Sequence, residues 1–125
     1  MFKINSETKQ VNLTRGDIAS FKIKAMNDDG TYYQFKTGDV ITLAIYEKKN
    51  LENTKLKKGV IVAEPSEDVI LNLTSEDTKL DELTNKPIEY WYEITLKNTN
   101  SNDEQTIIGY DENGAKIFKL YPEGE

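Results

Sequence analysis

The sequence contains no cysteine and no histidine. Without cysteine the chain can form no disulfide, no zinc–thiolate site and no thiol nucleophile. Without histidine it has no Ser-His-Asp or Cys-His catalytic arrangement, and it lacks the imidazole that holds most protein-bound zinc and iron. An enzyme built on this chain would have to use carboxylates, lysine, tyrosine and serine alone. We therefore expect a non-enzymatic protein with no metal and no cofactor.

Positive charge and long apolar runs are also scarce. The chain has 22 acidic and 16 basic residues, which gives a net charge of −6. Such a chain repels phosphate backbones and anionic lipid headgroups, so we expect neither a nucleic acid nor a membrane as its partner. No apolar run approaches the ~20 residues of a membrane helix. The opening residues, Met1–Asn5, lack the apolar core of a secretion signal, so we expect synthesis in a cytoplasm.

The apolar residues that are present recur at every second position, which is typical of β-strands. Residues 21–26 alternate in this way, residues 40–46 are apolar almost throughout as in a central strand, and turn residues follow roughly every tenth position. This pattern predicts an all-β fold, an antiparallel β-sandwich or barrel of about eight short strands. Residues 48–58 are predicted to form a loop or a fraying hairpin end. With no linker or repeat, residues 1–125 are expected to form one domain.

One short segment is the only helical candidate. Residues 75–83 begin with acidic side chains, and either Thr74 or Ser75 could cap the first turn. We expect at most one short helical turn there.

The clearest alternation lies in residues 88–96. One face carries Ile88, Tyr90, Tyr92, Ile94 and Leu96, and the other carries Glu89, Trp91, Glu93 and Thr95. A tryptophan on an otherwise polar face is either covered by a loop or used in an interface. Trp91, Glu89 and Glu93 are therefore the candidate interface. An alternative is a carbohydrate platform made by Trp91 with Tyr32, Tyr33, Tyr90, Tyr92 and Tyr110.

The tripeptide Arg15-Gly16-Asp17 allows two interpretations. On a mobile loop tip it could be an adhesion ligand, but here it stands between two strand-like segments. Glycine tolerates the backbone conformations of tight turns, and aspartate can bond to its own backbone. Gly38-Asp39 repeats the same transition from a Gly-Asp pair into a strand. We therefore expect Arg15, Gly16, Asp17, Gly38 and Asp39 to mark turns.

Acidic residues suggest two further sites, which the spacing does not favour. Asp28-Asp29 and Asp111-Glu112 lack the Asp-x-Asp-x-Asp-Gly pattern of a calcium loop, although weak calcium binding where separate loops meet stays open. Glu89 and Glu93 lie four residues apart on one predicted strand, with Cα atoms roughly 13 Å apart. Glycosidase carboxyl groups are separated by at most ~9.5 Å. A solvated strand face is the simpler interpretation of this pair.

Several short motifs together resemble a known family. They are Val11-x-Leu13-Thr14-Arg15-Gly16-Asp17, Asp29-Gly30-x-Tyr32, Gly38-Asp39-Val40-Ile41, Asp77-Thr78, Tyr90-x-Tyr92-Glu93-Ile94-x-Leu96 and Gln105-Thr106-Ile107. Over residues 11–121 the chain resembles small structural proteins of phages and prophages of Firmicutes, similar to the N-terminal domain of phage baseplate upper proteins. The resemblance implies an immunoglobulin-like antiparallel β-sandwich that serves as a building or attachment module of a tail tip. It brings no catalytic residues.

The chain departs from that family at three places. The family usually has aspartate where Glu93 stands, and a glycine shortly before the tyrosines where this chain has Pro87-Ile88. The last residues, Tyr121–Glu125, carry no receptor-binding or fibre extension, which favours a stand-alone module over host recognition. The resemblance implies other tail and baseplate proteins as partners, together with a second copy of the chain. The expected final location is the virion, after synthesis in a bacterial cytoplasm.

Overall fold

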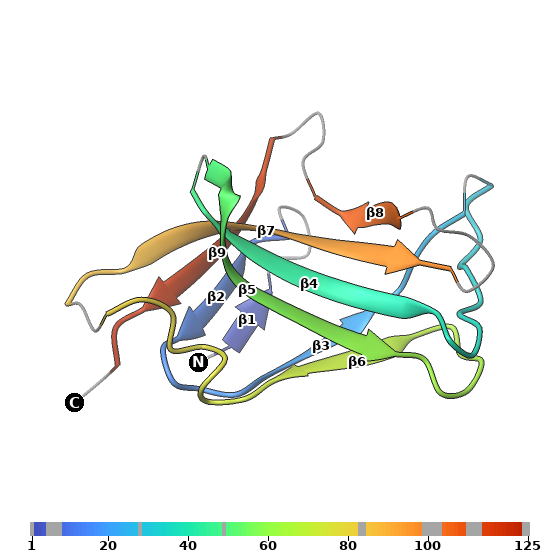
Figure 1. The fold of residues 1–125 in the computed structure, drawn as a ribbon, viewed down its shortest axis with the longest axis horizontal. Helices are drawn as coiled ribbons and strands as arrows, with labels where there is room; N and C mark the ends of the chain where they lie inside the picture. Colours follow the sequence, from blue (N-terminus) through green and yellow to red (C-terminus); the bar gives the residue numbers. More distant parts are fainter. Residues whose placement is uncertain are drawn as a thin grey trace.

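The chain folds into strands that form two sheets (Figure 1). The computed structural model describes residues 2–4, 9–27, 29–48, 50–82, 85–98, 104–109 and 114–123. The strands are β1 (Phe2–Ile4), β2 (Val11–Thr14), β3 (Ala19–Ile23), β4 (Val40–Glu47), β5 (Asn50–Ile61), β6 (Val69–Leu73), β7 (Ile88–Lys97), β8 (Glu104–Ile108) and β9 (Lys116–Tyr121).

The larger sheet contains seven strands: six in the order β1-β2-β9-β7-β4-β5, and β8, which pairs with β7. The strand β7 occupies its middle and pairs with β4 along one side. Its other side is shared, because β9 pairs with residues 88–92 and β8 pairs with residues 94–97. As the apolar pattern predicts, β4 is a central strand, between β7 and β5.

The smaller sheet consists of β3 and β6, paired antiparallel, and it lies below β4 and β5 in the view of Figure 1. In variable-type immunoglobulin domains, strands G, F, C and C′ share one sheet while B and E lie in the other. The order β9-β7-β4-β5 opposite β3-β6 follows that arrangement, with the strands in the same order along the chain. The fold is therefore an immunoglobulin-like β-sandwich.

The core fills the space between the two sheets. Alternate residues of β3 and β6 are buried, and on the predicted apolar face of β7 all residues are buried except Ile88, which is partly buried. Tyr90 and Tyr92 are 2% and 4% exposed, which confirms them as core residues. The ring of Tyr92 packs edge-on against Phe118 of β9, with centroids 6.5 Å apart. Other fully buried side chains are Val11, Leu13, Phe35, Ile41, Leu43 and Ile45.

One strand pair corrects the expectation of a purely antiparallel sandwich. β2 runs parallel to β9, with Val11 opposite Phe118 and Leu13 opposite Leu120. These strands come from opposite ends of the chain. Both parallel and antiparallel strands alternate apolar and polar residues when one face is buried, so the alternation did not reveal the direction.

A second correction concerns residues 48–58, which the sequence predicted to be a loop or a fraying hairpin end; they are not a loop. Most of this segment belongs to β5, which pairs with β4. Val40 stands opposite Ile61 at one end of the pair, and Glu47 stands opposite Asn50 at the other end. β5 is an edge strand of the large sheet, and its outward-facing Lys57 and Gly59 are exposed. Lysines are common on edge strands because they discourage pairing with other chains. The segment therefore looks like a loop in sequence although it is a strand.

The helical candidate forms a turn and no helix within the described residues. Residues 75–78 are turn residues, and the Thr74 hydroxyl accepts a hydrogen bond from the Asp77 backbone N–H at 3.2 Å. The Asp77 carboxylate accepts one in return from the Thr74 N–H at 2.9 Å. This reciprocal pattern is a capping box, with Thr74 and not Ser75 as the cap. In the part of the chain that the structure describes, no helix has the length and apolar character to cross a membrane.

Candidate functional site

Trp91 lies on the outer face of the large sheet, at its centre. It is half-buried and stands opposite Tyr46 of β4 on one side and Ile117 of β9 on the other. Glu89 and Glu93 flank it along β7, so the structure brings the three predicted interface residues together on one face. The neighbouring strands, which the sequence pattern could not place, supply the apolar surroundings of the indole.

Both carboxylates beside Trp91 are engaged. Glu89 forms an ion pair with Lys48, at 2.7 Å, and this contact lowers the pKa of the carboxyl group. Glu93 accepts a hydrogen bond of 2.8 Å from the Tyr46 hydroxyl. Burial and the bond to Glu93 raise the pKa of Tyr46 to about 12. A glycosidase acid needs a raised pKa, which is opposite to the shift at Glu89.

The aromatic residues proposed for a carbohydrate platform do not gather on one face. Tyr90 and Tyr92 lie in the core, and the ring of Tyr33 packs edge-on against Phe35, with centroids 5.3 Å apart. Tyr32 is 48% exposed, and the Lys24 ammonium lies 4.7 Å from its ring centre. Tyr110 lies outside the described residues. Of this set, Trp91 alone is described on the outer face of the large sheet.

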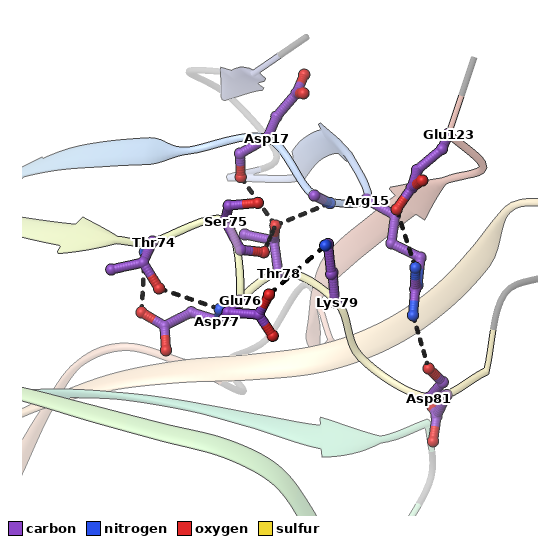
Figure 2. Close-up of polar contacts among 11 residues, drawn as sticks. Arg15, Asp17, Thr74, Ser75, Glu76, Asp77, Thr78, Lys79, Asp81 and Glu123 are labelled. Atoms are coloured by element: carbon purple, nitrogen blue, oxygen red, sulfur yellow. Dashed lines mark hydrogen bonds and ion pairs between the residues drawn. The ribbon is translucent and has the colours of Figure 1, made fainter. Parts of the chain in front are cut away.

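Arg15, Gly16 and Asp17 form a tight turn between β2 and β3 (Figure 2). The Asp17 N–H donates to the Thr14 carbonyl at 3.0 Å, and Gly16 has a φ of 88°. The Arg15 guanidinium bonds to Glu123 at 2.9 Å and to the Asp81 carbonyl at 3.1 Å, and its side chain is only 16% exposed. An adhesion ligand needs a displayed arginine. The geometry is that of a turn held against the body of the protein.

Thr78 anchors this turn. Its side chain is completely buried, and its hydroxyl accepts a hydrogen bond from the Gly16 N–H at 3.0 Å. The same hydroxyl lies 2.8 Å from the Asp17 carbonyl and 3.1 Å from the Ser75 carbonyl, as Figure 2 shows. One hydroxyl therefore joins the β2–β3 turn to the segment that follows β6. Sequence reasoning missed this residue because it stands in a polar stretch with no apolar pattern.

Asp81 is a second residue that the sequence reasoning missed. Its carboxylate accepts hydrogen bonds from Lys55 of β5 at 2.8 Å and from the Tyr90 hydroxyl at 2.7 Å. Its backbone has a φ of 54°, a conformation that aspartate tolerates better than most residues. Together with the carbonyl bond from Arg15, these contacts connect the β2–β3 turn, β5 and β7.

Replacing Gly16 with alanine should lower the free energy of unfolding by about 1–2 kcal/mol, because side chains rarely adopt a φ of 88°. The new Cβ would also lie 3.2 Å from the Glu123 carboxylate oxygen. Gly30→Ala imposes a similar backbone cost with nothing within 4 Å, whereas Gly59 has no positive φ and serves as the control. Urea unfolding measures all three. Equal stabilities of the Gly16 and Gly59 variants would contradict the turn.

Acid should weaken the contacts of Asp81. The hydrogen bond from Lys55, followed by that from Tyr90, lowers the pKa of this carboxyl group from 3.8. When the pKa is lower in the folded state, the carboxylate adds stability that is complete above pH 3.8. This stability is lost as the pH falls through the pKa of the folded state. We expect Asp81→Asn to be less stable at neutral pH and to lose less stability in acid than the unchanged protein. Glu76→Gln, at an exposed carboxylate, should retain the full acid dependence; an identical dependence in Asp81→Asn would refute this role.

Gly38 and Asp39 form a turn of the same kind. Gly38 has a φ of 94°, and the Asp39 N–H donates to the Lys36 carbonyl at 3.0 Å. The Asp39 carboxylate is buried and accepts hydrogen bonds from the Lys36 N–H and the Tyr33 hydroxyl, both at 2.9 Å. Burial, followed by the contact with Asp39, raises the pKa of Tyr33 to about 12. The repeated Gly-Asp pair thus corresponds to a repeated turn.

The acidic turns offer no collected metal ligands within the described residues. No group of three or more acidic side chains converges there. The Asp29 carboxylate instead accepts hydrogen bonds from the Thr31 N–H at 2.9 Å and from its hydroxyl at 2.6 Å. Asp28, Asp111 and Glu112 lie outside the described residues.

A hollow of about 190 Å³ lies between β8 and the segment that follows β3. It is lined by Ala25, Met26, Asn27, Tyr33, Leu96, Gln105, Thr106 and Ile107. No pattern in the sequence predicted it, because its walls come from three separate segments. Comparison with models of protein families, with curated protein sequences and with solved structures found no match to this chain.

Proposed function

We propose that this chain is a non-enzymatic structural protein of a phage or prophage tail, where it acts as a baseplate assembly module through protein–protein contacts. The short motifs of the sequence support the phage assignment by resemblance. The immunoglobulin-like sandwich supports a building or attachment role by analogy, since many proteins with other functions share this architecture.

The observation that carries this proposal is the set of unpaired strand edges. Among the described strands, β3 and β6 pair only with each other, and β5 pairs only with β4. An unpaired edge presents backbone N–H and C=O groups to which a partner strand can bond. β6 has no charged residue, and Ile70 on its outer face is 46% exposed. These edges suit an assembly protein that joins other chains by strand pairing.

The face around Trp91 is the second contact surface in this proposal. Tryptophan is enriched at the energetic centres of protein interfaces. Here it lies between two charged residues, Glu89 and Glu93. Glu93 is bonded to Tyr46 of β4, and Glu89 is bonded to Lys48, which directly follows β4. Such a half-buried apolar centre with a charged rim is a common form of protein interface.

The experiment is to size the purified protein alone and after mixing with proteins encoded by neighbouring tail genes. The proposal predicts a homo-oligomer, a complex with at least one tail protein, or both. Trp91→Ala should weaken the complex if the outer face takes part. A strict monomer that binds none of these proteins would contradict the assembly function.

Carbohydrate binding through Trp91 is the alternative function, supported by the position of the indole beside Tyr46 on an accessible sheet face. Trp91 is the only tryptophan of the chain, so its fluorescence reports directly on that face. Titration with bacterial cell-wall glycans should change the fluorescence, and glycan-array binding should disappear in Trp91→Ala. Unchanged fluorescence across these glycans would exclude this alternative.

A further inference from the structure

The hollow beside β8 is lined by neutral side chains. Ala25 and Leu96 are buried, at 8% and 3% exposed, whereas Met26 is 63% exposed. Asn27, Gln105 and Thr106 add side-chain amides and a hydroxyl. In a chain with a net charge of −6, this is a place where an uncharged group can bind without desolvating a charge.

An unpaired strand edge adjoins the hollow. Within the described part of the chain, β8 pairs with β7 alone, with Gln105 opposite Leu96. Both of these residues line the hollow, as does Ile107, two positions further along β8. A peptide that adds to the free edge of β8 would therefore run past the hollow. In this mode of recognition, backbone hydrogen bonds supply affinity and a pocket for a side chain supplies specificity.

Two of the other unpaired edges, those of β5 and β3, are less suited to an apolar segment. The strand β5 carries Lys55, Lys57 and Lys58. The strand β3 carries Lys22, and Lys24 directly follows the end of this strand. Lysines on an edge oppose the addition of a further strand. β8 has one charged residue, Glu104, at its very beginning, where it accepts a hydrogen bond from Thr95.

We propose that the β8 edge and the adjoining hollow together form a docking site for an extended, uncharged peptide segment of a partner protein. The segment adds as a strand to β8 and places one aliphatic side chain in the hollow, against Met26, Ala25 and Leu96. The neutral lining selects an uncharged segment, and the flexible, polarisable Met26 adapts to the shape of the side chain. This inference rests on the proposed assembly function and specifies the site through which it acts.

The test uses a displayed library of random dodecamer peptides, selected on the full-length protein. The enriched peptides should be uncharged and should contain an aliphatic residue at a constant position. Bound to the isotope-labelled protein, a synthetic copy should shift the NMR signals of residues 104–108 and 25–27. Met26→Lys should weaken its binding about tenfold or more, as expected when a charge enters an apolar contact.

Ile18→Lys is the matched control. Ile18 is also exposed, at 74%, but lies before β3, at the opposite end of that strand from Met26. This variant should bind the peptide as the unchanged protein does. The proposal is overturned if no peptide is enriched, or if a cell-wall glycan and no peptide occupies the hollow. It is also overturned if the NMR shifts fall elsewhere, such as on the Trp91 face, or if the Met26→Lys and Ile18→Lys variants bind the peptide equally well.

The outcomes also separate this site from the assembly function. A tail protein that binds normally to the Met26→Lys variant would leave the assembly function standing and refute the site. Peptides that dock on β8 while no tail protein binds would support the site and refute the tail assignment.

Discussion

Replacing Thr78 with valine is expected to lower the free energy of unfolding by about 3 kcal/mol. Valine has nearly the shape of threonine but no hydroxyl, so the completely buried site stays filled. The Gly16 N–H and the Asp17 carbonyl would each lose the hydrogen bond that they form with this hydroxyl. Both groups belong to partly buried residues, and the loss of a hydrogen bond in such a place costs about 1–3 kcal/mol for each group. Urea unfolding monitored by circular dichroism measures the loss.

Two controls isolate the hydroxyl. Thr78→Ser keeps it and should recover most of the lost stability. Thr54→Val removes a hydroxyl from an exposed position of β5 and should change stability by less than about 0.5 kcal/mol. If Thr78→Val were as stable as Thr54→Val, Thr78 would not anchor the β2–β3 turn.

Alkaline pH should unfold the protein through its buried and half-buried tyrosines. Burial is the largest cause that raises the pKa of Tyr33 and Tyr46 from 10.0 to about 12, and it raises the pKa of Tyr90 and Tyr92 further still. A raised pKa in the folded state means that the associated stability is complete below pH 10 and is lost as the pH rises through the folded value. For the half-buried Tyr33 and Tyr46, this loss is at most about 3 kcal/mol each, because solvent screens part of the effect.

Tyrosinate absorbance, followed together with circular dichroism, measures this effect. The part of the absorbance change that comes from these four of the seven tyrosines should coincide with loss of the β signal, above pH 10. Tyr46→Phe removes one of the four groups and should make the dependence on alkaline pH shallower. Tyrosines that all ionise near pH 10 while the sheets stay intact would contradict their burial.

The features of the fold that could be predicted from the sequence are those with a local period. The alternation of residues 88–96 predicted which side chains of β7 enter the core, and the apolar run at residues 40–46 predicted a central strand. The turn at Gly16 could be predicted because a tight turn restricts the residues that fit it.

The remaining features depend on contacts between distant residues. The parallel pairing of β2 with β9 joins the two ends of the chain, and no local pattern encodes its direction. β5 has polar residues on an exposed edge, and among its described side chains only Leu56 and Val60 are apolar and partly buried against the core, so its period is weak. The hydrogen bonds of Thr78 and Asp81 reach residues in other parts of the sequence, such as the β2–β3 turn and β5. Only the folded chain reveals them.

The candidate sites, too, could be predicted from the sequence only in part. Trp91, Glu89 and Glu93 share a face because they alternate on one strand, and this could be predicted. Their partners, Tyr46 and Lys48, could not, because the register between β4 and β7 determines them. The hollow at β8 needs three segments to meet, which no single stretch of sequence records.

The most direct test of the proposed function is mass spectrometry of phage particles purified from cells that carry this gene. A structural protein of the tail should be found in intact particles in a fixed ratio to the other tail proteins, and it should remain there after a high-salt wash. Assembled particles that form normally and lack this chain would contradict the proposal.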